Sequence, residues 1–152
     1  MFDNISGKYD FLNHTLSLGI DRGWRKKALK KIKISEVRHL LDIATGTGDF
    51  AIAAKKSGCE QVTGIDISNG MLEVGREKVM KLGMQQSVTL TYGDSEQMPF
   101  PDNTFDAITV AFGVRNFETL DKGLSDMCRV LKQNGSLVVL EFSKPTNPIF
   151  SR

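Results

Sequence analysis

The chain is poor in cysteine and proline and has no long hydrophobic run. Its 152 residues include only two cysteines, Cys59 and Cys128. Their 69-position separation fits neither a metal-ligand pair nor a disulfide framework, so we expect free thiols in a reducing cytosol and no metal site. No apolar run approaches the roughly 18–20 residues that cross a bilayer. Residues 1–10 carry two aspartates and no apolar core, which excludes a signal peptide. These absences predict a soluble, cytoplasmic protein.

An excess of charge of one sign is also missing. Twenty Lys and Arg residues against 18 Asp and Glu residues leave a formal net charge of +2. This balance predicts no basic face and makes nucleic acid a poor candidate partner. With 40% hydrophobic and 25% charged residues, the composition is that of an ordinary folded domain. The length suits one domain with a real core.

Turn residues divide the chain into alternating strands and helices. Apolar runs predict five strands, at 39–44, 61–66, 88–92, 105–112 and 136–142. Strands that alternate with helices imply right-handed crossovers, a mainly parallel sheet and helices on both faces. The predicted fold class is therefore α/β, a doubly wound, Rossmann-like sheet.

Helical spacing of apolar residues predicts the connecting helices. A short basic helix begins near Trp24, and a second helix covers 50–57. A third helix is capped by Ser68 and ends at Gly83, with an apolar face formed by Met71, Gly75, Val79 and Leu82. The last helix has an apolar face formed by Leu120, Leu124, Met127 and Leu131, and is predicted to end at Asn134 and Gly135.

Ligands of such sheets bind beyond the carboxyl ends of the strands, where the winding direction reverses. This rule brings 42–48, Asp66, Asp94 and 111–116 to one site, although they lie far apart in the sequence. Asp42, Asp66 and Asp94 each stand at or just after the end of an apolar strand. A single aspartate of this kind is as well explained as a turn residue, but three of them favour a binding site.

Residues 46–51 fit the G-x-G-x-x-A dinucleotide fingerprint, and Asp66 follows Gly48 by 18 positions. This signal alone is weak, because it suits a nicotinamide-binding fold equally well. Asp42, just ahead of the turn, is the discriminating residue. A fixed carboxylate would repel a pyrophosphate, whereas it favours S-adenosylmethionine, which carries an ammonium, a sulfonium and no phosphate. The pattern therefore favours the methyl donor over NAD.

The glycines let the backbone approach this ligand, and Asp66 is placed to accept both ribose hydroxyls. Asp94 is expected to accept from the adenine amino group, with the Ser95 N–H donating to a ring nitrogen. The complete predicted donor-binding set is Asp42, Ala44, Gly46, Thr47, Gly48, Asp66, Ile67, Asp94, Ser95 and Ala111.

Three further motifs resemble one known family. Residues 9–13 (YDFLN), with Trp24 following, resemble its N-terminal Tyr-Asp-x-Met-Asn signature, and residues 112–116 (FGVRN) resemble its Phe-Gly-x-Arg-Asn signature. Residues 129–132 and 140–145 resemble its third signature. The family is that of the class I S-adenosylmethionine methyltransferases of menaquinone and ubiquinone synthesis.

The chain departs from the family pattern at three positions. Asp21 stands where the family has His, so a role for that His does not carry over, and Leu12 replaces a Met of similar volume. Asn134 replaces the first glycine of a Gly-Gly turn, and Asn tolerates the left-handed conformation that this turn needs.

The resemblance implies C-methylation of a polyprenyl quinol ring, most simply 2-demethylmenaquinol. Arg115 is the candidate to face the developing phenolate, and Asn116 to hold a water or ring hydroxyl. Tyr9 is a candidate to cover the sulfonium, and Asp49 to relay a proton through water. For Tyr9, Asn116 and Asp49 structural roles are equally good explanations; for Asp49, the alternative is a carboxylate favoured at a helix N-terminus.

The resemblance also implies a division into residues 1–35, a helical segment that caps the substrate, and residues 36–152, a donor-binding domain. The family continues with further strands, so the final strands are expected to be missing and the fifth strand to be an open edge.

The basic stretch that begins near Trp24 suggests peripheral contact with anionic lipid, with a solvated helix face as the alternative. A homodimer is a further hypothesis. The competing functions are methylation of a benzoquinol or another small molecule, a non-catalytic donor-binding module, and a nicotinamide oxidoreductase.

Overall fold

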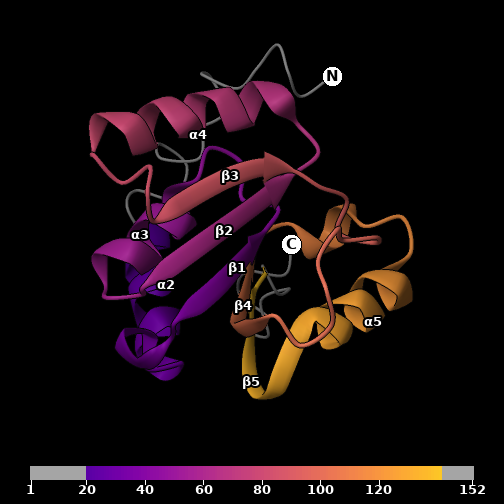
Figure 1. Ribbon diagram of the computed structural model, residues 1–152. Helices are drawn as coiled ribbons and strands as arrows, with labels where there is room; N and C mark the ends of the chain where they lie inside the picture. Colours follow the sequence, from indigo (N-terminus) through magenta and orange to yellow (C-terminus); the bar gives the residue numbers. More distant parts are fainter. Residues whose placement is uncertain (1–19, 142–152) are drawn as a thin grey trace, which may run out of the picture.

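The computed structural model of the chain describes residues 20–141. Its centre is a parallel sheet with strand order β3-β2-β1-β4-β5. The strands are β1 (His39–Ile43), β2 (Gln61–Asp66), β3 (Val88–Tyr92), β4 (Phe105–Ala111) and β5 (Leu131–Leu140). All four neighbouring pairs run parallel, and Figure 1 shows the strands fanning across the middle of the molecule. The predicted doubly wound α/β fold is confirmed.

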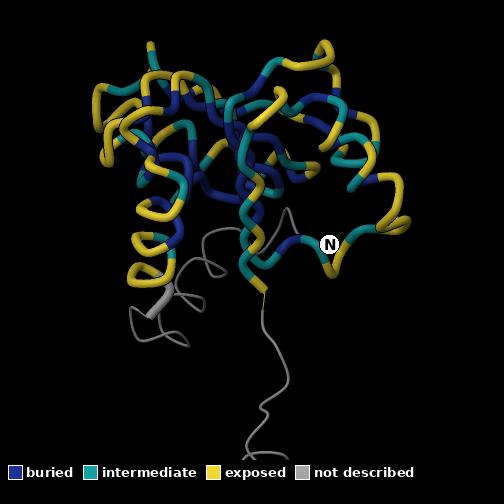
Figure 2. Tube along the Cα trace, turned by 90° about the horizontal axis from the view of Figure 1, so that it is seen from below, coloured by how far each residue is buried: buried dark blue, intermediate teal, exposed yellow. Residues whose placement is uncertain are grey.

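The helices cover both faces of this sheet. They are α2 (Ile20–Lys31), α3 (Asp49–Lys56), α4 (Asn69–Lys81) and α5 (Leu120–Val130), with short 3-10 turns η1 (Ile34–Glu36) and η2 (Val114–Asn116). Because strand side chains alternate, Leu40 packs under α2, α3 and α4, whereas Leu41 packs on the face that α5 covers. Figure 2 shows the buried residues between these two layers.

Helix α4 begins and ends as the sequence predicts, but only part of its predicted apolar face is buried. The Ser68 side chain accepts a hydrogen bond from the Met71 N–H at 3.3 Å, and Gly83 has a φ of 67°. The buried residues are Leu72, Gly75 and Val79. Leu82, predicted to be apolar core, is 44% exposed. The prediction was wrong for Leu82, which is the C-cap residue at the exposed end of α4, although its N–H still donates to the Lys78 carbonyl.

The end of α5 is a second correction. The sequence predicted a helix that continues to Asn134 and a strand that starts at 136, whereas α5 ends at Val130 and β5 starts at Leu131. The N–H groups of Asn103 and Thr104 already donate to the carbonyls of Arg129 and Val130, which draws the chain into the sheet early. Residues 132–135 then form a bulge, with Asn134 at a φ of 63°. The left-handed conformation expected of Asn134 is confirmed.

The described part of the segment 1–35 shares the core of the sheet. Ala28 and Leu29 of α2 are buried in the same cluster as Leu40 and Ala107.

Cys59 is buried, Cys128 is exposed, and both thiols are free, as expected. Among the helices of residues 20–141, none has the length and apolar character of a membrane span. Tyr9 and the rest of its motif lie outside the described residues, as does Phe142.

Candidate functional site

The carboxyl ends of four strands bring the candidate residues to one edge of the sheet. In the order β3-β2-β1-β4 the chain leaves the sheet just after Tyr92, Asp66, Ile43 and Ala111. The winding direction reverses between β1 and β4, which is the position where doubly wound sheets bind ligands. The prediction that these separate loops meet is therefore confirmed by the topology (Figure 1).

The loop after β1 is a tight turn with an unusual backbone. Gly46 and Gly48 have φ values of 57° and 79°, a left-handed backbone conformation that glycine adopts without steric cost. Ala44 also has a positive φ, 54°, which is costly for a residue with a Cβ. Thr47, between the two glycines, is buried. Strain of this kind gathers at functional sites, so the turn has the properties of a ligand cradle.

Two glycines outside the turn allow it to lie this close to the sheet and to α4. A Cβ on Gly64 of β2 would come within 2.7 Å of Thr45 Oγ1. A Cβ on Gly75 of α4 would come within 2.9 Å of the Thr47 carbonyl oxygen. Neither distance is tolerated by real side chains, so both positions require glycine for the observed packing. The glycine turn therefore packs closely against β2 on one side and against α4 on the other.

Asp42 lies beneath the turn and not on its surface. Its side chain is 1% exposed. One carboxylate oxygen accepts a 2.6 Å hydrogen bond from Thr45 Oγ1, and the other accepts a 2.7 Å bond from Thr109 Oγ1. Burial raises the pKa of Asp42 to about 6, against the opposing effects of the two hydroxyls and the positive charge of Arg25. Any role of Asp42 toward a ligand is therefore electrostatic or exerted through Thr45.

Replacing Asp42 with asparagine is expected to stabilise the ligand-free chain at pH 7.5. The rise in pKa from 3.8 to about 6 corresponds to about 3 kcal/mol. The folded chain holds this proton more tightly, so Asp42 favours folding below pH 3.8 and loses that contribution as the pH rises through 6. Urea unfolding of Asp42→Asn should show a gain of about 1–3 kcal/mol at pH 7.5 and a weaker pH dependence between 4 and 6.

The exposed Glu77 of α4 provides the matched control for this measurement. Glu77→Gln makes the same chemical change on the surface and should leave both stability and its pH dependence nearly unaltered. If Asp42→Asn were instead less stable than the original chain at pH 7.5, the burial cost assigned to Asp42 would be wrong.

Asp66 holds the loops after β1 and β2 together. Its two carboxylate oxygens accept hydrogen bonds from the Gly46 N–H at 2.8 Å and from the Ser68 N–H at 2.9 Å. Asp66 is only half-buried, so part of its carboxylate also faces outward beside the turn. This geometry fixes the carboxylate next to Gly46. A ribose diol at this place would share the oxygens with the two N–H groups.

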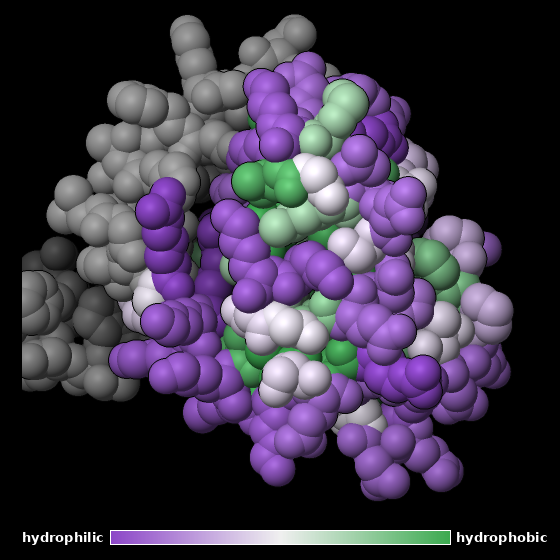
Figure 3. Space-filling view, turned by 60° about the vertical axis from the view of Figure 1, so that its left-hand side comes forward, coloured by the Kyte–Doolittle hydropathy of each residue, from purple (hydrophilic) through white to green (hydrophobic). Residues whose placement is uncertain are grey.

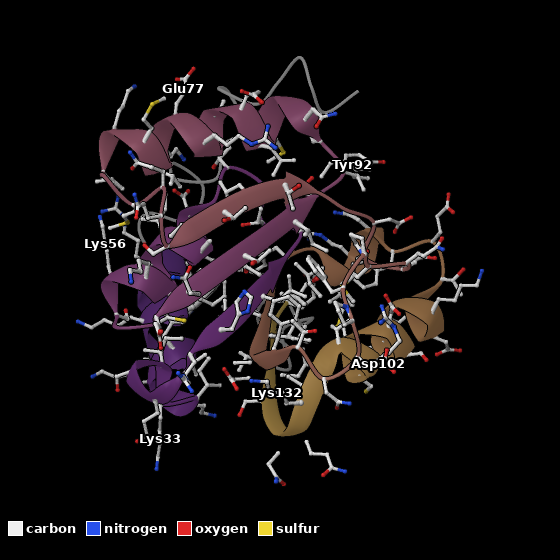
Figure 4. The ribbon with its side chains drawn as sticks, in the orientation of Figure 1. Lys33, Lys56, Glu77, Tyr92, Asp102 and Lys132 are labelled. Atoms are coloured by element: carbon white, nitrogen blue, oxygen red, sulfur yellow. The ribbon has the colours of Figure 1, made fainter. Side chains whose placement is uncertain are left out.

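The residues expected around an adenine form the outer rim. Asp94 is exposed, and its carboxylate accepts from the Glu96 N–H at 2.9 Å. Ser95 is half-buried beside it, and Ile67 is 65% exposed. Tyr92, at the end of β3, is another exposed apolar group at this edge (Figure 4). Exposed Ile67 and Tyr92 offer apolar surface for a base, beside a carboxylate acceptor.

Asp49 is engaged in an ion pair. Lys78 of α4 donates to Asp49 Oδ1 at 3.1 Å and to Thr47 Oγ1 at 2.9 Å. Asp49 also stands in the first turn of α3, where a carboxylate is favoured. These contacts agree with the alternative explanation of Asp49 as a structural carboxylate at a helix N-terminus. Through Lys78, they connect α3, α4 and the glycine turn.

The loop after β4 lies against the glycine turn. Phe112 has a φ of 56°, and a Cβ on Gly113 would come within 2.4 Å of the Ala44 Cβ, so the ends of β1 and β4 are in close contact. Arg115 and Asn116 follow in η2 and are exposed. Arg115 lies 3.9 Å from Glu141, just after β5. Both predicted residues therefore stand at the correct edge, with their side chains accessible.

The sequence analysis missed two residues of α2 at this site. The ring of Trp24 lies 6.3 Å from the ring of Phe112, centroid to centroid. The charge of Arg25 acts on the buried Asp42. The sequence analysis placed Trp24 in the N-terminal family signature and both residues in the basic stretch, but it gave neither of them a role at this site. Their i, i+4 relation to the buried Ala28 and Leu29 was the available signal that they face the sheet.

The residues present fit a cationic nucleoside better than a diphosphate. Two glycines shape the turn, the Asp66 carboxylate lies beside it and Asp42 lies beneath it, whereas Lys78 is already paired with Asp49. Among residues 20–141 no group of three or more His, Cys, Asp or Glu side chains could hold a metal ion.

Comparison with known proteins gives a consistent result. The chain is 58% identical over 146 residues to the demethylmenaquinone methyltransferase of Bacteroides fragilis, covering 95% of this chain and 60% of that protein. It is 47% identical over 154 residues to the ubiquinone/menaquinone biosynthesis C-methyltransferase UbiE of Geobacter sulfurreducens, covering all of this chain and 60% of that protein. The chain thus spans about 60% of the length of these relatives.

A similar solved structure is that of a SAM-dependent methyltransferase from Aquifex aeolicus. It superposes with a TM-score of 0.73 at 30% identity, over 82% of this chain and 66% of that one. The sheet is therefore the fold of S-adenosylmethionine-dependent methyltransferases. The model of the ubiE/COQ5 methyltransferase family matches residues 1–152, so the motifs, the fold and the relatives agree, and the chain belongs to the ubiE/COQ5 methyltransferase family.

Proposed function

We propose that this chain binds S-adenosylmethionine at the carboxyl edge of its sheet and methylates a carbon of a polyprenyl quinol ring, most simply 2-demethylmenaquinol. The observation that carries the proposal is the glycine turn with Asp66 bound to its Gly46 N–H, in a chain 58% identical to a demethylmenaquinone methyltransferase. Bound here, the donor supplies an electrophilic methyl group. The remaining chemistry falls to the residues of the chain.

We assign the donor contacts to the loops after β1, β2 and β3. Gly46, Thr47 and Gly48 present backbone to the donor, and Ala44 and Ala111 leave room at the ends of their strands. Asp66 accepts from the ribose, while Asp94 and Ser95 bind the adenine that rests on Ile67. Asp42 supports the site from below through Thr45.

The acceptor ring needs a group that stabilises its phenolate, because a ring carbon becomes nucleophilic only when a ring hydroxyl loses its proton. Arg115 stays charged and is accessible at the correct edge, so we assign it this role. Asn116 orients a ring hydroxyl, and Tyr9 covers the donor. Asp49 is the weakest member of the catalytic set, because its carboxylate is paired with Lys78. We assign residues 1–35 to covering the acceptor and 36–152 to holding the donor.

Calorimetry and a turnover assay test this function. S-adenosylhomocysteine should bind to the chain and NAD should not; the opposite result would favour a nicotinamide oxidoreductase. The natural full-length protein should then transfer a labelled methyl group to demethylmenaquinol faster than to the benzoquinol precursor of ubiquinone. Faster transfer to the benzoquinol would show that the benzoquinol, and not demethylmenaquinol, is the acceptor. Binding of the donor without any methyl transfer would favour a non-catalytic donor-binding module.

We further propose that α2 contacts an anionic membrane, where a polyprenyl acceptor resides. Six of its twelve residues are cationic and one is acidic, so α2 carries +5 and the rest of the chain −3. Its lysines, including Lys26, Lys27 and Lys30, are exposed. Beyond α2, Lys33 and Lys56 extend outward in Figure 4, on the mainly hydrophilic side that Figure 3 brings forward.

Reversing the charge of Lys26, Lys27 and Lys30 to glutamate is expected to lower partitioning onto phosphatidylserine vesicles at least about 100-fold, at about 1 kcal/mol for each lysine. Co-sedimentation with the vesicles at low salt measures this partitioning. The matched control reverses Lys81, Lys122 and Lys132, which lie in α4, α5 and β5. Equal losses for both triple variants, or no loss for either, would remove α2 as the contact.

We also propose that two copies of the chain form a homodimer through the edge strand β5. Within residues 20–141 no strand pairs with its outer edge, and Leu137 and Val139 are exposed there. Pairing of two β5 edges would satisfy the unpaired backbone groups of both strands. Light scattering of the eluted protein gives the mass directly, and a monomer at all concentrations tested would exclude this dimer.

A further inference from the structure

The loop after β3, which carries the candidate adenine contacts, is closed into a tight turn. Asp94 and Gln97 form an antiparallel bridge, and the Gln97 N–H donates to the Asp94 carbonyl at 3.2 Å. The Glu96 N–H donates to the Asp94 carboxylate at 2.9 Å, as is common where an aspartate begins a turn. The turn 94–97 therefore uses the backbone of Glu96 and leaves its carboxylate for another partner.

That partner belongs to the connection after β4, at the start of α5. Glu96 Oε1 accepts a hydrogen bond from the Thr119 N–H at 2.8 Å. Thr119 is the N-cap residue of α5, and its own side chain makes no capping bond. The N-cap N–H of a helix is often satisfied by a glutamate three residues later, but Lys122 stands at that position and has no acceptor. Glu96 supplies the acceptor from 23 residues upstream, and its negative charge is favoured at a helix N-terminus.

The same hydrogen bond fixes the end of the loop that carries Arg115. Residues 112–119 connect β4 to α5, and Arg115 lies within them, in η2. The Phe112 N–H donates to the Leu140 carbonyl at 2.7 Å, which fixes the first residue of this loop on β5. Glu96 fixes the last residue on the turn 94–97. The expected adenine contacts and the acceptor-side loop are thus joined by one side chain.

A second set of contacts holds the connection between β3 and β4 on α5 without Glu96. The Met98 N–H donates to the Asp126 carboxylate at 2.6 Å. Arg129 donates to the carbonyls of Met98 and Phe100, at 2.9 and 2.6 Å. These bonds involve the second half of α5. Removal of the Glu96 side chain is therefore expected to release the start of α5 and the loop before it, while the fold stays intact.

We propose that Glu96 is a positioning residue for methyl transfer: it joins the turn 94–97 to the N-cap residue of α5, and thereby fixes the loop 112–119, with Arg115, relative to the bound donor. The inference rests on the proposed function, because it needs a donor at the turn and Arg115 at the acceptor. Glu96 acts through the Thr119 N–H and is not itself a catalytic residue.

Steady-state kinetics of the natural full-length protein with demethylmenaquinol, together with calorimetry, test this role. Glu96→Ala should lower kcat about tenfold, because the group that stabilises the phenolate is no longer held in place. The affinity for S-adenosylhomocysteine should stay within threefold, since the Glu96 N–H still binds Asp94. Glu96→Gln keeps an acceptor oxygen and should retain kcat within threefold. Glu118→Ala is the matched control, because it removes an exposed carboxylate next to Thr119 and should change neither quantity.

A kcat of Glu96→Ala within twofold of the original protein would overturn the role of Glu96. An equal loss in Glu96→Gln or in Glu118→Ala would do so as well, because the loss would then not follow the hydrogen bond to Thr119. Equal losses of kcat and of donor affinity in Glu96→Ala would also overturn it, because they would indicate a general structural effect.

Hydrogen exchange of the backbone amides of 112–119, measured by mass spectrometry, is a second readout that needs no acceptor. Saturation with S-adenosylhomocysteine should slow this exchange in the original chain and in Glu118→Ala, but not in Glu96→Ala. Binding heat without slower exchange in the original chain would overturn this inference while leaving the proposed function intact. Absence of binding heat for the original chain would overturn the proposed function and this inference with it.

Discussion

Replacing Arg115 with alanine is expected to lower kcat of methyl transfer by about 100- to 1000-fold, the size of effect seen when one group that stabilises a developing oxyanion is removed. The affinity for S-adenosylhomocysteine should stay within about twofold, because Arg115 lies on the acceptor side, after β4. Steady-state kinetics with demethylmenaquinol, together with calorimetry, separate the two quantities.

The fold should not suffer from this substitution. The Arg115 side chain is 53% exposed and lies 3.9 Å from Glu141, and exposed ion pairs contribute at most about 1 kcal/mol. Glu141→Gln is the matched control, because it removes the same ion pair and keeps the guanidinium. Full turnover in Arg115→Ala, or an equal loss in Glu141→Gln, would show that the guanidinium does not act on the phenolate.

The Asp66→Ala variant should bind S-adenosylhomocysteine about 100-fold more weakly. Hydrogen bonds to a charged group contribute about 1.5–3 kcal/mol each, and the variant loses those to the ribose as well as those that fix Gly46 and Ser68. The expected loss corresponds to about 2.7 kcal/mol at 25 °C. Calorimetry measures it directly.

Asp66→Asn distinguishes charge from shape in this result. The amide keeps the size of the side chain and one acceptor oxygen, so the turn should survive while binding falls to an intermediate level. Thermal unfolding of both variants reports whether the loops after β1 and β2 remain joined. Affinity within threefold of the original chain in Asp66→Ala would exclude Asp66 as a ribose ligand.

Local patterns were sufficient for most of the sheet. The run 61–66 predicted β2 and the run 88–92 predicted β3 to the residue, because short apolar or β-branched runs between turn signals have few other structures available. The same reasoning predicted the Ser68 cap, which acts locally. Gly46 and Gly48 were predicted in a turn, and both hold the positive φ that explains the choice of glycine.

Long-range contacts explain what the patterns did not predict. The end of α5 depends on hydrogen bonds from Asn103 and Thr104, which are more than twenty residues away in the sequence. The burial of Asp42 depends on Thr109 of a neighbouring strand, which no pattern near Asp42 indicates. Arg25 was grouped with its lysine neighbours, although its charge acts on Asp42 of β1.

The sequence by itself determined the alternation of strands and helices, the glycine turn and the acidic residues at the strand ends, because these follow from spacing and backbone preference along the chain. Only the tertiary structure decided that Asp42 lies below the turn, that Asp49 pairs with Lys78, and that Trp24 and Arg25 face the site. Burial and electrostatic environment are properties of what packs against a residue, and those neighbours come from distant parts of the chain.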